Sequence, residues 1–285
     1  MNLALEGMTA LVTGGSSGIG WSVVERLARE GANVVPVAHR GVRRLDERLA
    51  TRPWRERALA VTADVTDQRA VESAFEQARR RFGRVDLLVT SAGVWPSEDL
   101  RLDRMPVDRL RRTLEVNLLG TLLSVRAFLA GLAAVGPRDD GRGAAVVLIG
   151  STAGRFGERG HADYAVSKAG LRGLLLTLKN EIVELDPLGR ANLVEPGWTR
   201  TPMAEPSLGL PGVLERTLQT TALARIACPG DIARPVAFLL SPVAARHVTG
   251  EVLTVSGGME GRVLRAADAV DRARVLGEPP ADGES

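Results

Sequence analysis

The chain has 285 residues, of which 45% are hydrophobic, so it is long enough to bury the core of one large α/β domain. Its net charge of +3 at pH 7 arises from basic residues interleaved with 34 acidic ones, without the basic stripe of a nucleic-acid-binding protein. We therefore expect no nucleic-acid partner.

Cysteine content and hydropathy exclude further classes of protein. Cys228 is the only cysteine, so no internal disulfide forms, and no Cys/His cluster has the spacing of metal ligands. The N-terminus lacks a basic segment followed by a long apolar one, and no apolar run approaches the ~18 residues of a membrane span. We expect a cytoplasmic protein with no metal ion and no membrane partner.

Short β-rich runs alternate with longer segments of helical periodicity. The runs that have the apolar character of buried strands lie at residues 8–14, 32–38, 57–64, 85–93, 144–151, 189–197 and 250–258. Helical patterns lie at residues 20–31, 68–83, 107–135 and 165–185. This alternation predicts an α/β fold with a doubly wound parallel sheet of about seven strands and helices on both faces.

The same pattern predicts one domain spanning residues 1–262. The segment GPRDDGRG at residues 136–143 has the composition of a surface loop that joins a helix to a strand. After Gly258 the sequence becomes polar and rich in arginine, so residues 263–285 are predicted to form a mobile C-terminal tail.

A glycine-rich segment, TGGSSGIG at residues 13–20, follows the first predicted strand and leads into a helix. Glycines let the backbone turn sharply and approach a pyrophosphate, whose charge is held by amide groups at the helix N-terminus. In this position the segment predicts a dinucleotide site, and an ordinary glycine-rich turn is the alternative. Asp64 ends a later strand, where its carboxylate would accept a hydrogen bond from adenine or would serve as a cap or turn residue.

Tyr164 is the only tyrosine in the chain, and Lys168, four positions later, is one of only two lysines. At helical spacing both side chains project from one face. An ammonium near a phenol lowers the phenol pKa from about 10 and makes it usable as a general acid or base. Ser151, at the carboxyl end of a predicted strand, would hydrogen-bond a substrate oxygen. The alternatives are a tyrosine packed by its ring beside a surface lysine, and a serine that caps a turn.

Together these segments resemble the short-chain dehydrogenase/reductase family, over roughly residues 5–258. The residues Thr13-Gly14-x-x-x-Gly18-x-Gly20 match the family's cofactor loop in type and spacing. The resemblance implies a Rossmann-type fold, a nicotinamide cofactor and the catalytic residues Asn117, Ser151, Tyr164 and Lys168.

Asn117 in EVNLLGT matches the family's helix asparagine, which helps to hold a water that links the lysine to solvent. Without such a site, Asn117 would be a costly polar residue in a buried helix.

Two more segments extend the resemblance. EPGWTRTPM resembles the family's Pro-Gly turn after the sixth strand, which borders the nicotinamide, and VTGEVLTVSGGM resembles the final strand. The cofactor-binding residues implied or predicted are Thr13, Gly14, Ser16, Ser17, Gly18, Ile19, Gly20, His39, Arg40, Asp64, Val65, Ala92, Gly93, Tyr164, Lys168, Pro196, Gly197, Thr199 and Thr201.

The chain also departs from the family pattern. Thr90-Ser91-Ala92-Gly93 stands where the family reads Asn-Asn-Ala-Gly, so amide hydrogen bonds that brace the central sheet are lost, while Gly93 still lets the backbone approach the adenosine ribose. Thr199 replaces the usual aliphatic residue, which is a milder change.

The end of the second predicted strand favours NADP(H) over NAD(H). An NAD site places an acid there to bind the ribose 2′-hydroxyl, whereas this chain has Ala38 followed by His39, Arg40, Arg43 and Arg44. Arg40 or Arg43 would pair with phosphate oxygens, and a solvated helix start is the alternative. The arginine that NADP-preferring members carry in the phosphate loop is missing, because Ser16 and Ser17 occupy those positions.

The predicted activity is that of an NADP(H)-dependent carbonyl reductase or secondary-alcohol dehydrogenase of the ketoreductase type. Tyr164 is the general acid or base, while Lys168 lowers its pKa and binds the nicotinamide ribose. The alternative, from a different class, is a cofactor-binding sensor or scaffold without catalysis.

We expect a small, largely hydrophobic carbonyl or alcohol substrate, covered by residues 203–223. Val94, Trp95, Thr152, Phe156 and Trp198 are candidates for the pocket lining, and His161 is a further one. The family usually forms dimers or tetramers through its long central helices, so the resemblance implies a homo-oligomer, either a dimer or a homotetramer.

Overall fold

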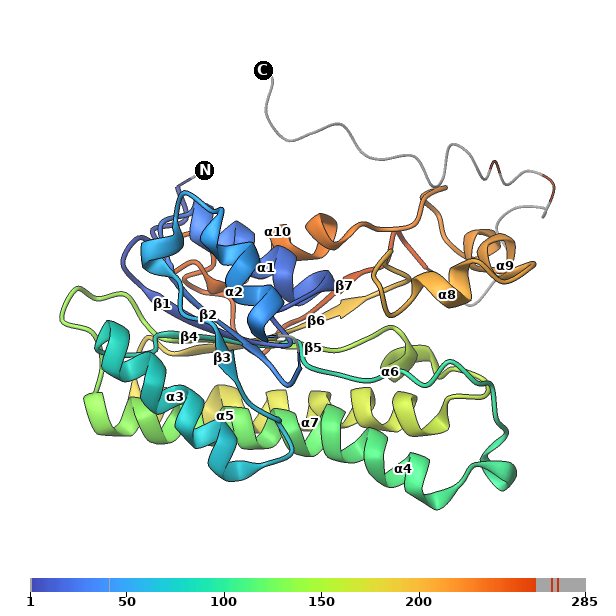
Figure 1. Cartoon of the computed structure of the whole chain (residues 1–285), viewed down its shortest axis with the longest axis horizontal. Coiled ribbons are helices and arrows are strands. Elements are labelled where there is room, and N and C mark those ends of the chain that lie inside the picture. Colours follow the sequence, from blue (N-terminus) through green and yellow to red (C-terminus); the bar gives the residue numbers. More distant parts are fainter. Residues whose placement is uncertain (1, 41, 260–267, 269–270, 272–285) are drawn as a thin grey trace.

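The computed structural model describes residues 2–40, 42–259, 268 and 271, and it contains a seven-stranded sheet with helices on both faces (Figure 1). The strand order is β3-β2-β1-β4-β5-β6-β7, and all neighbouring strands are parallel. The predicted doubly wound α/β fold is therefore confirmed. The predicted tail at residues 263–285 lies outside the described residues, apart from Asp268 and Asp271.

Each strand lies within one of the predicted runs. The strands are β1 (Thr9–Thr13), β2 (Asn33–Ala38), β3 (Val61–Thr62), β4 (Leu87–Thr90), β5 (Ala145–Ile149), β6 (Arg190–Pro196) and β7 (Val252–Val255). Every residue of β1, β4, β5 and β6 is buried, which explains why these runs are apolar almost throughout. β3, at the sheet edge, is much shorter than its predicted run.

The helices form two layers. One layer contains α3 (Gln68–Phe82), α4 (Val107–Leu114), the π-helical turn η3 (Glu115–Leu119), α5 (Gly120–Val135) and α7 (Ala162–Leu185). The other contains α1 (Gly18–Arg29), α2 (Val42–Ala50) and α10 (Pro229–Leu240) (Figure 1). The remaining short helices are η1 (Arg55–Arg57), η2 (Leu102–Arg104), α6 (Ala153–Phe156), α8 (Glu205–Leu208) and α9 (Val213–Gln219).

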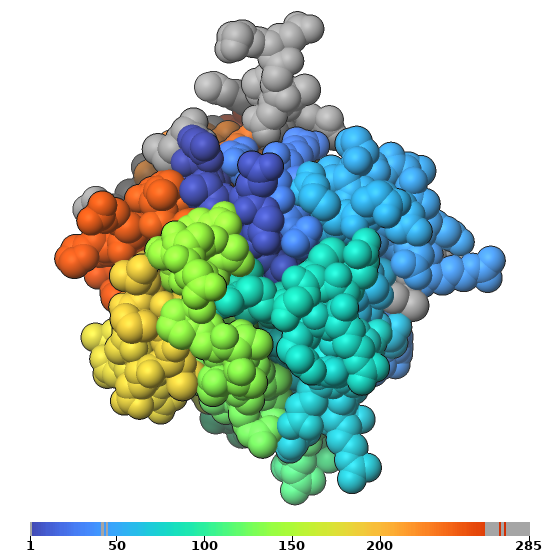
Figure 2. Space-filling model, turned by 90° about the vertical axis from the view of Figure 1, so that its left-hand side faces the viewer, coloured from blue at the N-terminus to red at the C-terminus, as the bar shows by residue number. Residues whose placement is uncertain are grey.

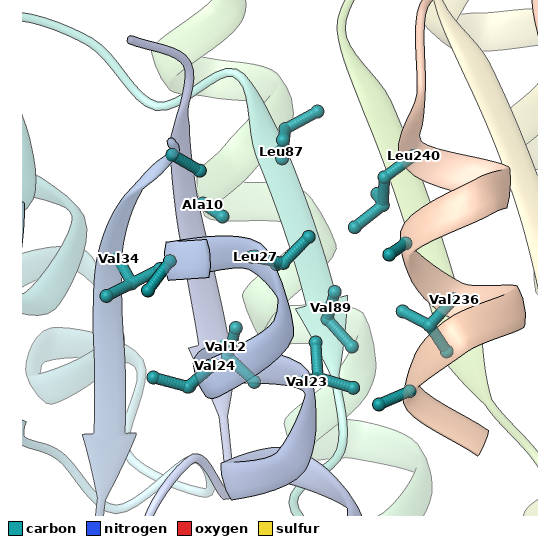
Figure 3. Close-up of a cluster of buried hydrophobic side chains, with 14 of the residues drawn as sticks. Ala10, Val12, Val23, Val24, Leu27, Val34, Leu87, Val89, Val236 and Leu240 are labelled. Carbon is teal, nitrogen blue, oxygen red and sulfur yellow. The ribbon is translucent and has the colours of Figure 1, made fainter. Parts of the chain in front are cut away.

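The strands supply alternate side chains to two separate cores. In β4, Leu87 and Val89 belong to the core under α1 and α10, while Leu88 belongs to the core under α3, α5 and α7. Figure 3 shows the first core, in which Leu27 of α1 and Val236 of α10 point toward the strands.

Helix α10 is the main element that the sequence analysis did not predict. Its residues Ile232, Val236 and Leu240 recur at intervals of four and are fully buried. Pro235 inside the helix and Pro229 at its start obscure the pattern, because proline usually ends a helix.

A continuous helical segment, Val107–Val135, joins α4, η3 and α5. It is the one helix among the described residues that is long and apolar enough to cross a membrane, so the statement that no apolar run approaches that length was wrong. In the fold this segment contacts α3, α7 and β4, and its residues Val125, Ala127, Phe128 and Leu132 belong to the core. Its apolar composition therefore has an explanation in packing.

Hydrogen bonds and ion pairs of charged residues connect the segments at the amino-terminal edge of the sheet. Buried Asp86 precedes β4 and accepts a hydrogen bond from the Thr9 backbone N–H at 2.9 Å, with Arg84 as an ion-pair partner. In the loop before β5, Arg142 donates to the Glu6 carbonyl oxygen at 2.7 Å. Figure 2 shows this side of the molecule, where the dark blue N-terminal residues adjoin the green segment. The carboxyl ends of the strands lie at the opposite edge.

Candidate active site

A cavity of about 610 Å³ lies at the carboxyl ends of the strands. It spans the point between β1 and β4 where the strand order reverses, which is the usual ligand position in such sheets. The structure brings nearly all of the predicted site residues into its wall; the exceptions are Thr13 and Asn117. Thr13 lies behind the wall, where its hydroxyl accepts a hydrogen bond from the Ala92 N–H at 3.3 Å.

The glycine-rich segment forms one end of this cavity, at the N-terminus of α1. Gly14 has a φ of +66°, and a Cβ there would lie 2.8 Å from the backbone of Ala92. A Cβ at Gly20 would lie 2.3 Å from the Gly14 carbonyl oxygen. The first turn of α1 carries no acidic residue. A close backbone turn at an uncompensated helix N-terminus fits a pyrophosphate.

The hydroxyl groups of Ser151 and Tyr164 meet in the cavity. Ser151 follows β5, Tyr164 lies in the first turn of α7, and the two hydroxyls are hydrogen-bonded to each other. Lys168 lies one helical turn after Tyr164, and its Nζ atom donates to the Ile149 carbonyl oxygen at 2.9 Å. The predicted juxtaposition of serine, tyrosine and lysine is therefore present in the structure.

Burial sets the protonation states of this cluster. Withdrawal from water raises the pKa of Tyr164 to about 12, although the hydrogen bond from Ser151 acts in the opposite direction. Burial also lowers the pKa of Lys168 to about 8. The structure therefore differs from the expectation that Lys168 lowers the pKa of Tyr164, because burial dominates and the ammonium is bonded to the Ile149 carbonyl. At neutral pH the phenol keeps its proton and can donate it.

Asn117 lies in the π-helical turn η3, behind the cavity wall, and is completely buried. Its side chain accepts a hydrogen bond from the Val94 N–H at 2.7 Å and donates to the Val94 carbonyl oxygen at 2.9 Å and to Ser167 Oγ at 3.1 Å. These bonds satisfy the amide, so burying it is not costly. A Cβ on Gly93 would lie 3.2 Å from Asn117 Oδ1 and 3.6 Å from Lys168 Nζ, which explains why glycine suits this position.

His39 and Arg40 follow β2 and line the cavity with Asp64. His39 Nδ1 lies 2.8 Å from Asp64 Oδ2, while Asp64 Oδ1 accepts hydrogen bonds from the Thr66 N–H and hydroxyl. Burial acts to raise the pKa of Asp64, but the bonds from Thr66 and the charge of His39 hold it below its usual value. Asp64 thus has the turn role that the sequence left open. Arg43 lies outside the cavity wall and pairs with Glu47 at 3.4 Å.

The other end of the cavity is lined by Val94, Trp95, Thr152 and Trp198, as predicted, and by Met203 and Ala204. Phe156 was predicted wrongly: it is 46% exposed and does not line the cavity. Most of residues 203–223 forms α8 and α9, which pack around a small core of Leu208, Leu214 and Leu218.

The positions of two residues at the tryptophan-lined end of the cavity could not be predicted from the sequence. His161 is buried behind the wall, where its ring stacks on Trp95 with 4.7 Å between ring centroids. Glu158 lines the cavity and was missed altogether. A lone glutamate in a polar loop gives no sequence signal, because such residues are usually solvated.

The departure at Thr90 has a visible consequence. Its hydroxyl is buried and has no hydrogen-bond partner among the described residues. The neighbouring Ser91 keeps a backbone bond to the Thr13 carbonyl oxygen at 3.2 Å, so the end of β4 is still held to β1.

Comparison with known proteins adds to this geometry. A family model described as enoyl-(acyl carrier protein) reductase matches residues 14–260, which includes every strand after β1 and all of the cavity-lining residues. The chain belongs to the short-chain dehydrogenase/reductase family. It is thus an oxidoreductase of this family, for which a nicotinamide cofactor is expected.

The similar proteins differ in activity. The chain is 33% identical to a 3-oxoacyl-[acyl-carrier-protein] reductase of Vibrio cholerae over 262 residues, which cover 90% of this chain and 98% of the relative. It is 35% identical to an L-rhamnose 1-dehydrogenase (NAD(P)(+)) of Sphingomonas, covering 90% and 97%. A crystal structure of a short-chain dehydrogenase/reductase, glucose/ribitol dehydrogenase, from Brucella melitensis matches with a TM-score of 0.80, 31% identity and coverage of 90% and 98%.

Proposed function

We propose that the chain is an NADP(H)-dependent oxidoreductase that reduces a carbonyl group or oxidises a secondary alcohol, with Tyr164 as the general acid or base. The observation that carries this proposal is the hydrogen-bonded pair of Ser151 and Tyr164 in a cavity that also contains a phosphate-binding glycine loop. Both features lie in the wall of this one cavity, where a cofactor and a substrate would meet.

The chemistry follows from the two hydroxyls. A substrate carbonyl oxygen accepts hydrogen bonds from Ser151 and Tyr164, which polarises the carbonyl carbon. The nicotinamide, when bound, supplies the hydride that this carbon receives. Tyr164, protonated at neutral pH because its pKa is about 12, gives its proton to the oxygen. The hydrogen bond from Ser151, which acts to lower the pKa of Tyr164, then stabilises the phenolate until it is reprotonated.

The preference for NADP(H) rests on the end of β2. Ala38 occupies the position where an acid would bind the ribose 2′-hydroxyl, and Arg40 lines the cavity beside it. Arg40 forms no ion pair with the described residues, so its guanidinium is free to pair with a 2′-phosphate.

Assembly and location complete the proposal. Large apolar side chains on the outer faces of η3, α5 and α7 are exposed, namely Leu119, Leu122, Val166, Leu176 and Val183. These faces support a homo-oligomer, either a dimer or a tetramer. We place the enzyme in the cytoplasm, where its single free cysteine stays reduced.

A panel of carbonyl compounds tests the proposal, with oxidation of NADPH followed by its absorbance. Turnover of at least one ketone, with NADPH preferred to NADH, is the expected result. Tight NADPH binding without turnover of any carbonyl compound would contradict the proposal and favour a cofactor-binding sensor or scaffold.

A further inference from the structure

Glu158 places a carboxyl group in the wall of the substrate end of the cavity. It lies between α6 and α7, in the same lining as Trp95, Trp198 and Tyr164, and its side chain is 25% exposed. Its charge is close enough to Tyr164 to act on the phenol directly. A titratable group so near the reacting atoms has chemical consequences for the substrate.

The side chains of Trp95 and His161 hold the Glu158 carboxyl group in place. Trp95 Nε1 donates to Glu158 Oε2 at 3.4 Å, and His161 Nδ1 lies 3.9 Å from Glu158 Oε1. The His161 ring is itself stacked on Trp95 with an interplanar angle of 10°, and its Nε2 lies 2.7 Å from the Pro96 carbonyl oxygen. Glu158 is therefore a positioned group, not a solvated loop residue.

These contacts leave the carboxyl group poorly compensated. No arginine or lysine in the described part of the chain forms an ion pair with Glu158. His161 and the bond from Trp95 favour its charged form, whereas burial and the acidic Asp99 and Asp163 oppose it. Burial raises the pKa of Glu158. A long hydrogen bond from an indole does not offset the burial of a carboxylate, so a purely structural role would be served better by glutamine.

The surroundings point to the chemistry of the ligand. Trp95 and Trp198 meet edge to face with 5.9 Å between ring centroids, and both line the cavity beside Glu158. Tryptophan rings offer a flat apolar surface to C–H groups, while the carboxyl oxygens accept hydrogen bonds. A negative charge on these oxygens repels an anionic ligand, while a neutral hydroxyl donor gives them a hydrogen bond without burying a second charge.

We propose that Glu158 is a specificity-determining residue that accepts a hydrogen bond from a substrate hydroxyl close to the reacting carbonyl. The substrate class is then an uncharged hydroxylated compound with an apolar face, such as a cyclic hydroxy ketone or a sugar. This inference rests on the proposed function, because Ser151 and Tyr164 fix the oxygen from which the hydroxyl is positioned. It also refines the expectation of a largely hydrophobic ligand.

Paired substrates test the inference. With NADPH, kcat/KM is measured for 2-hydroxycyclohexanone and for cyclohexanone, in the wild type and in Glu158→Ala and Glu158→Gln. The wild type should prefer the hydroxy ketone by about tenfold or more, the worth of one hydrogen bond to a charged group. Glu158→Ala should bring the ratio close to one, while Glu158→Gln, whose amide oxygen still accepts a hydrogen bond, should keep part of it.

Asp99→Asn is the matched control. It also removes a carboxylate near His161, at 3.5 Å, but Asp99 is 79% exposed and does not line the cavity. The preference for the hydroxy ketone should be unchanged in this variant.

If the wild type turns over both ketones with nearly equal kcat/KM values, the inference is overturned and the proposed function still stands. An equal loss of both activities in Glu158→Ala overturns it as well. If neither ketone turns over, the proposed function fails for this substrate class, and binding decides the inference. Quenching of tryptophan fluorescence in the enzyme–NADP⁺ complex should then show tighter binding of trans-1,2-cyclohexanediol than of cyclohexanol, and equal binding overturns the inference.

Discussion

Lys168 Nζ lies 5.7 Å from the centre of the Tyr164 ring and donates a hydrogen bond to the Ile149 carbonyl oxygen at 2.9 Å. The ammonium is thus fixed between the end of β5 and the phenol on which catalysis is proposed to depend. Burying this charge lowers the pKa of Lys168 to about 8, so the site carries an energetic cost.

That cost predicts that removing the buried charge makes the folded protein more stable. Lys168→Met should raise the free energy of unfolding at pH 7 by about 1–2 kcal/mol, because a pKa lowered to about 8 costs roughly 3 kcal/mol and the lost hydrogen bond returns about 1. Between about pH 8 and 10 the unfolded wild type binds more protons than the folded protein, so wild-type stability rises with pH. The variant should lack this rise. Urea denaturation at pH 7 and pH 9.5 measures both effects, and a variant that is less stable at pH 7 contradicts the prediction.

Cofactor preference is predicted to depend on Arg40. Replacing it with alanine should weaken the binding of NADPH by about tenfold or more, because a charge-assisted bond to the 2′-phosphate is lost. The affinity for NADH should be nearly unchanged. Arg43→Ala serves as a control, since Arg43 pairs with Glu47 and does not line the cavity. A higher kcat/KM with NADH than with NADPH in the wild type refutes the preference.

Thr90 offers a stability prediction. Thr90→Val should increase the free energy of unfolding by about 1 kcal/mol, because it replaces a buried hydroxyl without a described partner by a methyl group of similar shape. Thr13→Val is the comparison: it removes an acceptor of the Ala92 N–H and should destabilise. Chemical denaturation of the two variants should therefore give opposite signs, and destabilisation by Thr90→Val would show that its hydroxyl is satisfied.

The exposed apolar faces predict assembly. Light scattering at micromolar concentration should give a mass that is two or four times the chain mass of 30.3 kDa. Leu176→Asp, on the outer face of α7, should shift the mass toward that of the monomer, since Leu176 is 57% exposed and contributes little inside one subunit. A wild-type mass of one chain would speak against the interface.

Much of the sheet could be predicted because parallel strands that are buried on both faces appear in the sequence as apolar runs. The π-helical turn around Asn117 could not, since the surrounding residues have ordinary helical periodicity. The distortion lies in the backbone, where the Gly120 N–H bonds to the Glu115 carbonyl oxygen five residues earlier. Helix α10 was missed because prolines mask its apolar repeat.

At the site, spacing and residue type brought Ser151, Tyr164 and Lys168 together correctly. The protonation of Tyr164 was not predictable in this way, because it depends on burial that the sequence does not reveal. Glu158 was missed for a related reason: only the stacking of Trp95 on His161 turns a loop carboxylate into part of the cavity wall.

The central claim is that Tyr164 supplies the proton to the substrate oxygen, and Tyr164→Phe tests it most directly. The variant keeps the ring and removes only the hydroxyl. NADPH binding should stay close to that of the wild type, while kcat for carbonyl reduction should fall by about a hundred- to ten-thousand-fold, as expected for the loss of a general acid. A kcat within a few-fold of the wild type would contradict the assignment.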